Sequence, residues 1–124
     1  MSADAGIVRV PLLDAALEAR PEIERVRGAR IELGPGQATG RHRHPCPVVG
    51  YVADGAIRFQ VEGEEEQILR PGDAFHEPAG GPIAHFDNAS ERDPATFIAF
   101  YLLAPGEDRL IEMLTSSGEP RGTG

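Results

Sequence analysis

Short apolar runs, separated by breaks rich in glycine and proline, predict that this chain consists mainly of β-strands. Charged and apolar residues interleave from residue 24 to 33, and the Gly-Pro-Gly segment at residues 34–36 then ends the pattern. Further along, Ile57, Phe59 and Val61 alternate with polar residues, which indicates a strand with one buried and one solvated face. Closely spaced strands with little helix between them predict a sandwich or a barrel.

The middle of the sequence carries a strong turn signal at Asp54-Gly55. This dipeptide stands between an apolar run at residues 47–53 and an alternating segment at residues 56–62. Because Asp-Gly suits a two-residue turn with positive φ angles, we expect these two segments to pair as a hairpin. Further strands are expected at residues 67–70, 74–77 and 83–86, because these short runs are separated by the Pro71-Gly72 turn and by the loop at residues 78–82, which is rich in proline and glycine.

Residues 96–103 are apolar on both faces of the strand that they are expected to form. The two faces carry Phe97, Ala99 and Tyr101 on one side and Ile98, Phe100 and Leu102 on the other. A strand that is apolar on both sides belongs in the interior of a sandwich or at a subunit interface.

The N-terminal residues 1–27 are expected to form an arm and the first strands. An apolar run at residues 7–10 leads to Pro11, which opens a helix-like stretch at residues 12–18. Proline is well placed at the start of a helix, because the N–H that it lacks would have no partner there.

The remaining chain divides into a barrel at residues 28–104 and a C-terminal segment at residues 105–124. Within that last segment we expect a short helix at residues 106–114. The polar residues 116–124 are expected to form a flexible tail.

Composition limits the functions that the protein can have. The 124 residues suit a single domain, and the formal net charge of -8 disfavours nucleic-acid binding. The single cysteine, Cys46, excludes an internal disulfide and suits a reducing compartment. No apolar run approaches the roughly 20 residues needed to cross a bilayer, and no secretory signal is recognisable. We therefore expect a cytoplasmic protein that binds neither nucleic acid nor membrane.

Two histidines, His42 and His44, are separated by one residue in a segment expected to be extended. Alternate residues of a strand face the same side, so their Cβ atoms would lie roughly 7 Å apart. Two imidazoles placed in this way can bind one cation, with each nitrogen at about 2.1 Å. A polar patch beside a turn is the alternative interpretation of the pair.

The spacing around these histidines resembles the first motif of the cupin superfamily, in which Gly, five residues and His-x-His precede a Glu and a second Gly. Gly36, His42, His44 and Gly55 stand at the corresponding positions. The second cupin motif is matched by Gly72, Pro78 and Gly80. The resemblance covers about residues 36–88, and the short spacing between the motifs is similar to that of small single-domain bacterial cupins.

This resemblance implies an all-β fold, the double-stranded β-helix of the cupin jelly-roll barrel, here with an N-terminal arm and a short C-terminal helix. It also implies a homodimer, since small cupins commonly pair. The two-sided apolar strand near residues 97–103 and the strand-like arm favour the same expectation, because an arm added to a partner's sheet would cover an exposed edge.

The sequence departs from the cupin pattern at two of the four usual metal ligands. The motif-one Glu position holds Val48 (or Val49, one residue later), and the motif-two His position holds Ile83. Loss of a carboxylate should weaken the binding of a divalent cation in an apolar barrel. His85 lies two residues beyond Ile83 and would share its face in a regular strand, so it is the expected third ligand beside His42 and His44. A pocket or core histidine satisfied by a hydrogen bond is the alternative interpretation of His85.

Several further residues are candidates for the wall of the pocket. His76 and Glu77 are adjacent and must face opposite ways, so only one of them can point inward, and the sequence leaves open which one does. Cys46 follows His44 by two residues and would share its face on a continuing strand, although a buried apolar role is the alternative. Tyr51 is expected to line the barrel, as core or as pocket wall, together with Val48 and Ile83.

Two functions are compatible with this interpretation. In the first, His42, His44 and His85 hold a divalent transition metal (Zn, Ni, Fe or Mn) that acts on or binds a small molecule. In the second, the barrel is metal-free and binds a small apolar or carboxylated ligand, or serves a regulatory role, without catalysis. No catalytic residue can be assigned from the sequence.

Overall fold

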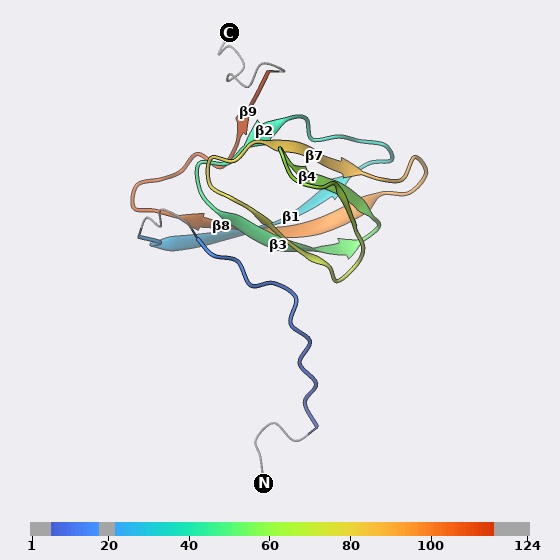
Figure 1. Ribbon diagram of the computed structural model, residues 1–124, viewed down its shortest axis with the longest axis horizontal. Helices are drawn as coiled ribbons and strands as arrows, with labels where there is room; N and C mark the ends of the chain where they lie inside the picture. Colours follow the sequence, from blue (N-terminus) through green and yellow to red (C-terminus); the bar gives the residue numbers. More distant parts are fainter. Residues whose placement is uncertain (1–5, 18–21, 116–124) are drawn as a thin grey trace.

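The computed structural model describes residues 6–17 and 22–115, and within these ranges the chain forms nine β-strands and no helix. Figure 1 shows the strands arranged in two layers. In chain order the strands are β1 (Arg25–Leu33), β2 (His42–Arg43), β3 (Val48–Asp54), β4 (Ile57–Val61), β5 (Gln67–Leu69), β6 (Ala74–Glu77), β7 (Ile83–Asn88), β8 (Ala95–Leu103) and β9 (Glu112–Met113).

All strand pairs are antiparallel, and they form two sheets. One sheet has four strands in the order β1-β8-β3-β6, and the other has five in the order β5-β4-β7-β2-β9. The inward faces of the two sheets enclose an apolar core whose centre is a group of aromatic rings from both layers. These rings belong to Phe59, Phe75, Phe86 and Phe97. The all-β jelly-roll expectation is confirmed.

Strand β8 occupies the interior position that its two-sided apolar pattern indicated, between β1 and β3. Its inward side chains, among them Phe97 and Leu103, are buried in the core. Its outward side chains face away from the other sheet, and the ring of Phe100 is 37% exposed. The apolar residues on that outer face therefore have no covering layer within the described part of the chain.

The expected hairpin at Asp54-Gly55 is wrong, although the turn itself is present. Strand β3 pairs with β6 and β8, whereas β4 pairs with β5 and β7, so the turn carries the chain from one sheet to the other. Gly55 has a φ angle of 79°, and a Cβ there would lie 2.7 Å from the carbonyl oxygen of Pro94. The dipeptide encodes the reversal of the chain, but the choice of partner strands depends on long-range pairing.

The expected C-terminal helix is not supported, because residues 106–114 leave a turn at Gly106, continue without regular structure and end in β9. β9 pairs with β2, with Met113 opposite His42, and the Leu114 N–H donates to the carbonyl of Arg41. β7 covers only one edge of β2, and β9 pairs with the other edge. The backbone groups of β9 therefore bond to a neighbouring strand, whereas in a helix they would bond within the segment. The tail expected at residues 116–124 lies outside the described residues.

The N-terminal segment at residues 6–17 has no helix either, and the last residue of the expected stretch, Glu18, lies outside the described part. Figure 1 shows this segment as an extended arm that runs away from both sheets. Among the described residues, no helix has the length and apolar character to cross a membrane.

Candidate metal centre

His42 belongs to β2 and His44 follows the end of that strand, and burial alternates along this stretch so that both imidazoles point into the barrel. His42 is 3% exposed and His44 is 5% exposed. Between them Arg43 faces outward, where its guanidinium contacts the carboxylate of Glu112 at 2.7 Å. The preceding Arg41 likewise pairs with Glu62 on the outside. Neighbouring residues of an extended chain face opposite sides. Because the charged side chains of Arg41 and Arg43 are on the outer side, His42 and His44 lie on the inner side.

Glu77, the last residue of β6, is the inward member of the adjacent pair His76 and Glu77. Its side chain is buried, and in the ladder between β3 and β6 it stands directly opposite Val48. Val48 is the position at which a cupin motif would place its ligand glutamate. The carboxylate is therefore supplied by the neighbouring strand, on the same wall of the barrel.

The three buried polar groups converge at one point. The Nε2 atom of His44 lies 2.6 Å from Oε2 of Glu77, and the Nε2 atom of His42 lies 3.5 Å from the same oxygen. One ligand atom from each residue lies within 4.8 Å of the other two, an arrangement that could hold a metal ion. The two imidazole rings stand nearly perpendicular, with centroids 5.0 Å apart.

Backbone carbonyls determine which nitrogen of each ring faces the centre. Nδ1 of His42 lies 2.7 Å from the carbonyl oxygen of Gly40, and Nδ1 of His44 lies 2.6 Å from that of Leu110. A carbonyl can only accept, so in the neutral rings Nδ1 carries the proton and donates it. Both Nε2 atoms then present lone pairs to Oε2 of Glu77, which has no hydrogen-bond donor. Three converging lone pairs in a buried site require a cation or an extra proton between them.

The titration of this group reflects the same demand for positive charge. Burial opposes ionisation of Glu77, but an imidazole of His42 or His44 that takes up a second proton can donate to the carboxylate, and this hydrogen bond and charge outweigh burial and lower the pKa of Glu77. Burial also opposes protonation of His42, yet the hydrogen bond and charge of Glu77, together with the Gly40 carbonyl, raise the pKa of His42. Without a metal, a proton shared between imidazole and carboxylate therefore stabilises the site.

These shifts predict a stability maximum of the metal-free protein at weakly acidic pH. The raised pKa of His42 contributes stability that is complete below 6.5 and is lost as the pH rises through the raised value. The lowered pKa of Glu77 contributes stability that is complete above 4.5 and is lost as the pH falls through the lowered value. In urea titrations with chelator, wild type should therefore exceed His42→Gln most between pH 4.5 and 6.5. An advantage that instead grew above neutral pH would contradict the assignment.

A cavity of about 150 Å³ adjoins the three ligand candidates. Its wall is mostly apolar, and Tyr101 adds one hydroxyl. The Tyr101 ring lies edge-on to His44 with centroids 5.8 Å apart, and burial together with the charge of Glu77 raises the pKa of Tyr101. The other lining residues include Val48, Phe75, Phe86, Phe97, Ala99 and Ile111. The site is thus a small, largely apolar chamber with its polar groups at one end.

The structure does not bring His85, the expected third ligand, to His42 and His44. The His85 side chain is 35% exposed, and its Nδ1 lies 2.9 Å from Oδ2 of Asp87. The pairing of β7 with β4 shifts by one residue at Ala84, so Ile83 faces the core while His85 faces outward. The expectation assumed a regular strand, and this irregularity reverses the side on which His85 lies.

The other expected pocket residues divide between the site and the rest of the molecule. Val48 lies in the wall of the cavity, whereas Ile83 is fully buried in the core opposite His42. Cys46 is also a core residue, 1% exposed, and burial raises its pKa to about 11. Tyr51 is 41% exposed on the outer face of the four-stranded sheet, since it is an odd number of residues from inward-facing Val48.

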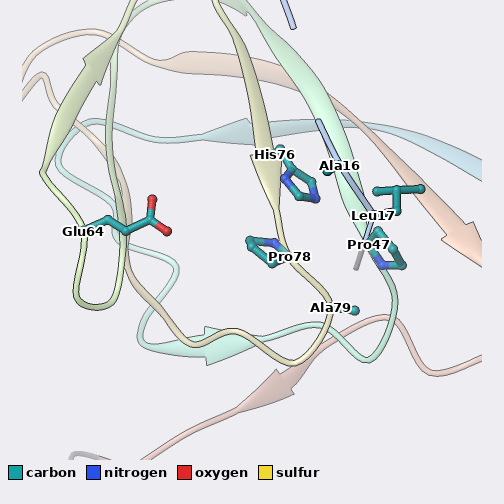
Figure 2. A pocket seen from close by; sticks show the side chains of 7 residues that line it. All are labelled: Ala16, Leu17, Pro47, Glu64, His76, Pro78 and Ala79. Atoms are coloured by element: carbon teal, nitrogen blue, oxygen red, sulfur yellow. The ribbon is translucent and has the colours of Figure 1, made fainter. Parts of the chain in front are cut away.

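His76 lies on that outer face too, beside a different cavity of about 270 Å³. Figure 2 shows its imidazole on β6, with Ala16, Leu17 and Pro47 on one side and Glu64 on the far side. The Nε2 atom of His76 is buried and has no hydrogen-bond partner. His76 therefore does not belong to the group formed by His42, His44 and Glu77.

Sequence reasoning placed Tyr101 in the barrel wall, as core or as pocket lining, but it missed the contact of Tyr101 with His44 and the role of Glu77 as a ligand candidate. The alternation of β6 contained a usable signal, because Phe75 is the large apolar residue of that strand and Glu77 is on the same side. An inward Phe75 therefore implied an inward Glu77. No comparable local signal indicated that Tyr101 would contact His44, since the two residues are far apart in the sequence.

Taken together, the geometry defines a small jelly-roll barrel with a buried histidine and carboxylate group of the kind that holds a metal ion. The family model of the cupin domain matches residues 29–101, which is more than half of the chain. The chain therefore belongs to the cupin family, and the resemblance seen in its motifs is confirmed.

Three solved structures illustrate this similarity. Protein TT1209 from Thermus thermophilus is 35% identical, with 68% of this chain and 78% of that chain covered and a TM-score of 0.57. A cupin-like protein from Thermotoga maritima is 23% identical, with 76% and 68% covered and a TM-score of 0.60, which supports the fold alone. A structure described under the DMSP lyases RdDddP and RnDddQII is 25% identical, with a TM-score of 0.61. The match covers 73% of this chain but only 44% of that one. The comparison with curated proteins gave no match.

Proposed function

We propose that this protein binds a divalent transition-metal ion through His42, His44 and Glu77 and uses it to bind or transform a small molecule in the barrel. The observation that carries the proposal is the convergence of two imidazole lone pairs on a buried carboxylate oxygen without a donor. The carbonyls of Gly40 and Leu110 hold the rings in this orientation. Such second contacts are typical of ligating histidines.

The residues present fit a metal ion of this class. Donor atoms that share an ion at roughly 2.1 Å lie about 3.0–3.4 Å from one another. The separations of 2.6 Å and 3.5 Å from the Glu77 oxygen fall close to that range. Two imidazoles and one carboxylate on one side of an ion leave coordination positions open, a donor set suited to Fe, Mn, Ni or Zn. When bound, such an ion supplies Lewis acidity or redox chemistry.

A small anionic molecule with oxygen donors is the proposed ligand. A divalent ion held by one carboxylate and two neutral imidazoles leaves a net charge of +1, which a single carboxylate ligand would neutralise in an apolar chamber. The cavity of about 150 Å³ admits only a small ligand, and Tyr101 in its wall can donate a hydrogen bond to it. The similarity to the DMSP lyase structures supports catalysis on a small molecule.

A metal-free binding module is the second candidate, and one observation favours it. The raised pKa of His42 and the lowered pKa of Glu77 favour a proton held between these two groups in the absence of metal. In that state His42 and His44 would act as hydrogen-bond donors to a ligand, and the apolar wall would supply the remaining contacts.

Elemental analysis separates the two candidates. Wild type, His42→Ala and His85→Ala would be purified without an affinity tag and analysed for first-row transition metals. We expect near-stoichiometric metal in wild type and in His85→Ala. In His42→Ala the metal content should fall at least about tenfold, because His42 belongs to the ligand group and His85 does not. His85→Ala is the matched control, since it also removes one imidazole.

Two outcomes would overturn the metal proposal. The first is folded wild-type protein that contains no metal and acquires none when Fe, Mn, Ni or Zn is added. The second is equal metal content in all three proteins, which would show that the ion binds elsewhere on the chain. Folding of each variant would be checked by circular dichroism.

We also infer that the protein works in a reducing compartment such as the cytosol. Its single cysteine, Cys46, is buried, and its pKa of about 11 keeps the thiol protonated. An internal disulfide, the usual stabilising bond of small secreted domains, is not available to this chain.

A further inference from the structure

The chamber at the candidate metal centre opens to solvent between the edges of the two sheets. Most of its lining residues are buried, and the three that are not are Ile31, Thr39 and Ile111, which define the mouth of the chamber. Ile31 lies on β1, at the edge of the four-stranded sheet. Ile111 directly precedes β9, at the edge of the five-stranded sheet. A molecule that reaches the metal site therefore passes β1.

Arg27 on β1 lies in one cross-strand row with the ligand candidate Glu77. Glu77 on β6 stands opposite Val48 on β3, which in turn stands opposite Tyr101 on β8. Tyr101 stands opposite Arg27. Directly paired residues share a face of the sheet, so all four project toward the inside of the barrel. Because Arg27 is at the end of this row, on the edge strand, its side chain is exposed.

The row determines how far Arg27 lies from the metal ligands. Neighbouring strands are roughly 4.8 Å apart, so three steps place the backbones of Arg27 and Glu77 about 14 Å from each other. The Oε2 atom of Glu77 already approaches His44, whose ring contacts that of Tyr101. An arginine side chain that extends from the other end of the row leaves a gap the length of a short organic molecule, over the chamber wall at Val48 and Tyr101.

Arg25 shows the direction that an arginine can take from this face of β1. It is two residues from Arg27 and therefore on the same face of the strand. Its guanidinium donates to the carbonyl oxygen of Glu107 at 3.0 Å. Glu107 belongs to the segment that crosses from β8 to β9 beside the start of β1 (Figure 1). The Arg25 side chain thus spans the opening between the sheets, and Arg27 is one step closer to the chamber.

The charge of Arg27 is not neutralised within residues 6–17 and 22–115, because no carboxylate of these residues pairs with it. The arginines that flank the histidines differ in this respect, since Arg41 pairs with Glu62 and Arg43 with Glu112. The formal net charge of the chain is -8, so an uncompensated cation near the mouth contrasts with its surroundings. Such a cation attracts an anion to the chamber.

We propose that Arg27 is a specificity-determining residue that binds the second carboxylate of a small dicarboxylate whose first carboxylate lies at the metal ion. The inference rests on the proposed function, because the ion holds the inner end of the molecule. One excess positive charge at the ion and its ligands and one on Arg27 together match a dianion. The guanidinium suits this role, because its planar fork binds a carboxylate through two parallel hydrogen bonds.

The chamber also limits the body of the molecule between its two ends. Apart from the metal ligand candidates, only Thr39 and Tyr101 contribute polar side chains to the wall. An apolar wall favours a chain of methylene groups over a hydroxylated one. The volume of about 150 Å³ accepts a short chain, with its outer carboxylate at the mouth.

Isothermal titration of the zinc-loaded protein tests the role of Arg27. The probes are acetate, malonate, succinate and glutarate, so the second carboxylate is first absent and then placed at increasing distance. We expect at least one dicarboxylate to bind wild type at least about fivefold more tightly than acetate, which is the upper range for an exposed ion pair. In Arg27→Gln this preference should disappear, whereas acetate should bind as in wild type.

Arg30→Gln is the matched control. Arg30 is exposed on the same strand, but it stands opposite Ile98 and so faces the outer side of the sheet. It should keep the full preference for the dicarboxylate. Both arginines are exposed, so neither substitution removes a contact of the core.

A charge reversal tests whether Arg27 contacts the ligand directly. The probe pair is glutarate and 4-aminobutanoate, which carries an ammonium group in place of the second carboxylate. Wild type and Arg30→Glu should prefer glutarate, and Arg27→Glu should prefer 4-aminobutanoate, because the new carboxylate attracts the ammonium group. A merely structural role of Arg27 would weaken both probes and leave their order unchanged.

The outcomes separate this inference from the proposed function. Protein that holds no zinc by elemental analysis would overturn both. Zinc-loaded wild type that binds no dicarboxylate more tightly than acetate would overturn the role of Arg27 and leave the metal site intact. Equal loss of the preference in Arg27→Gln and Arg30→Gln would do the same, because it would show that only the net charge of the surface matters.

Discussion

Glu77→Val is expected to reduce the affinity for the transition metal by about 100-fold or more. Glu77 supplies the negative charge of the ligand group, and its Oε2 atom lies closest to His44. Removing it leaves a divalent ion uncompensated in an apolar chamber, where each unpaired charge is costly. Isothermal titration of the metal-free protein with Zn²⁺ or Mn²⁺ measures the loss.

The position of the carboxylate predicts how this loss can be repaired. Val48 stands directly opposite Glu77 in the ladder, and both residues line the same cavity. In the double variant Val48→Glu/Glu77→Val the carboxylate moves to the adjacent strand, where the cupin motif normally places it. We expect the double variant to regain at least about tenfold of the lost affinity, since charge and direction are restored.

The control for this exchange is Val49→Glu/Glu77→Val. Val49 is adjacent to Val48 but faces the outer side of the sheet, so its carboxylate cannot reach His42 and His44. This variant should bind metal no better than Glu77→Val alone. Equal recovery in the two double variants would contradict the site, because it would show that net charge, and not position, determines the affinity.

Phe86→Ala is expected to destabilise the metal-free barrel by roughly 3–5 kcal/mol. Phe86 is 2% exposed, and its ring centroid lies 4.6 Å from that of Phe97 and 5.0 Å from that of Phe75. Both neighbours belong to the opposite, four-stranded sheet, so truncation opens a void between the two layers that they cannot easily fill. Urea denaturation in the presence of chelator measures the change without a contribution from bound metal.

Ile68→Ala is the control for the aromatic core. Ile68 is 46% exposed, so its truncation should cost less than about 1 kcal/mol. If Phe86→Ala were as mild as this control, the two layers would not be held together by the aromatic group, and the packing described above would be incorrect.

Much of the fold could be predicted from local pattern. Alternation located most of the strands to within a few residues, because a period of two is a property of the strand itself. The same alternation placed His42 and His44 on one face. It failed at His85, because one shifted residue at Ala84 reverses every later side chain relative to the earlier ones.

The candidate site was predictable only in part. The histidine pair is visible in the sequence, because the two residues are separated by only one position. The identity of the third ligand depends on how distant strands pair. Glu77 became a ligand candidate because β6 pairs with β3 in a register that sets it opposite Val48. The carbonyl that orients His44 belongs to Leu110, in a segment that pattern alone assigned to a helix. Neither contact has a counterpart in any short stretch of the sequence.

The sequence by itself determined the class of the protein. Its strand periods, its turn glycines and its two cupin motifs are local features, and each persists whatever the rest of the chain does. Only the tertiary structure decided which sheet each strand joins, which side His85 faces and which residue supplies the carboxylate. Those choices depend on register and on hydrogen bonds between distant segments, whose free energies are realised only when the two sheets close around a common core.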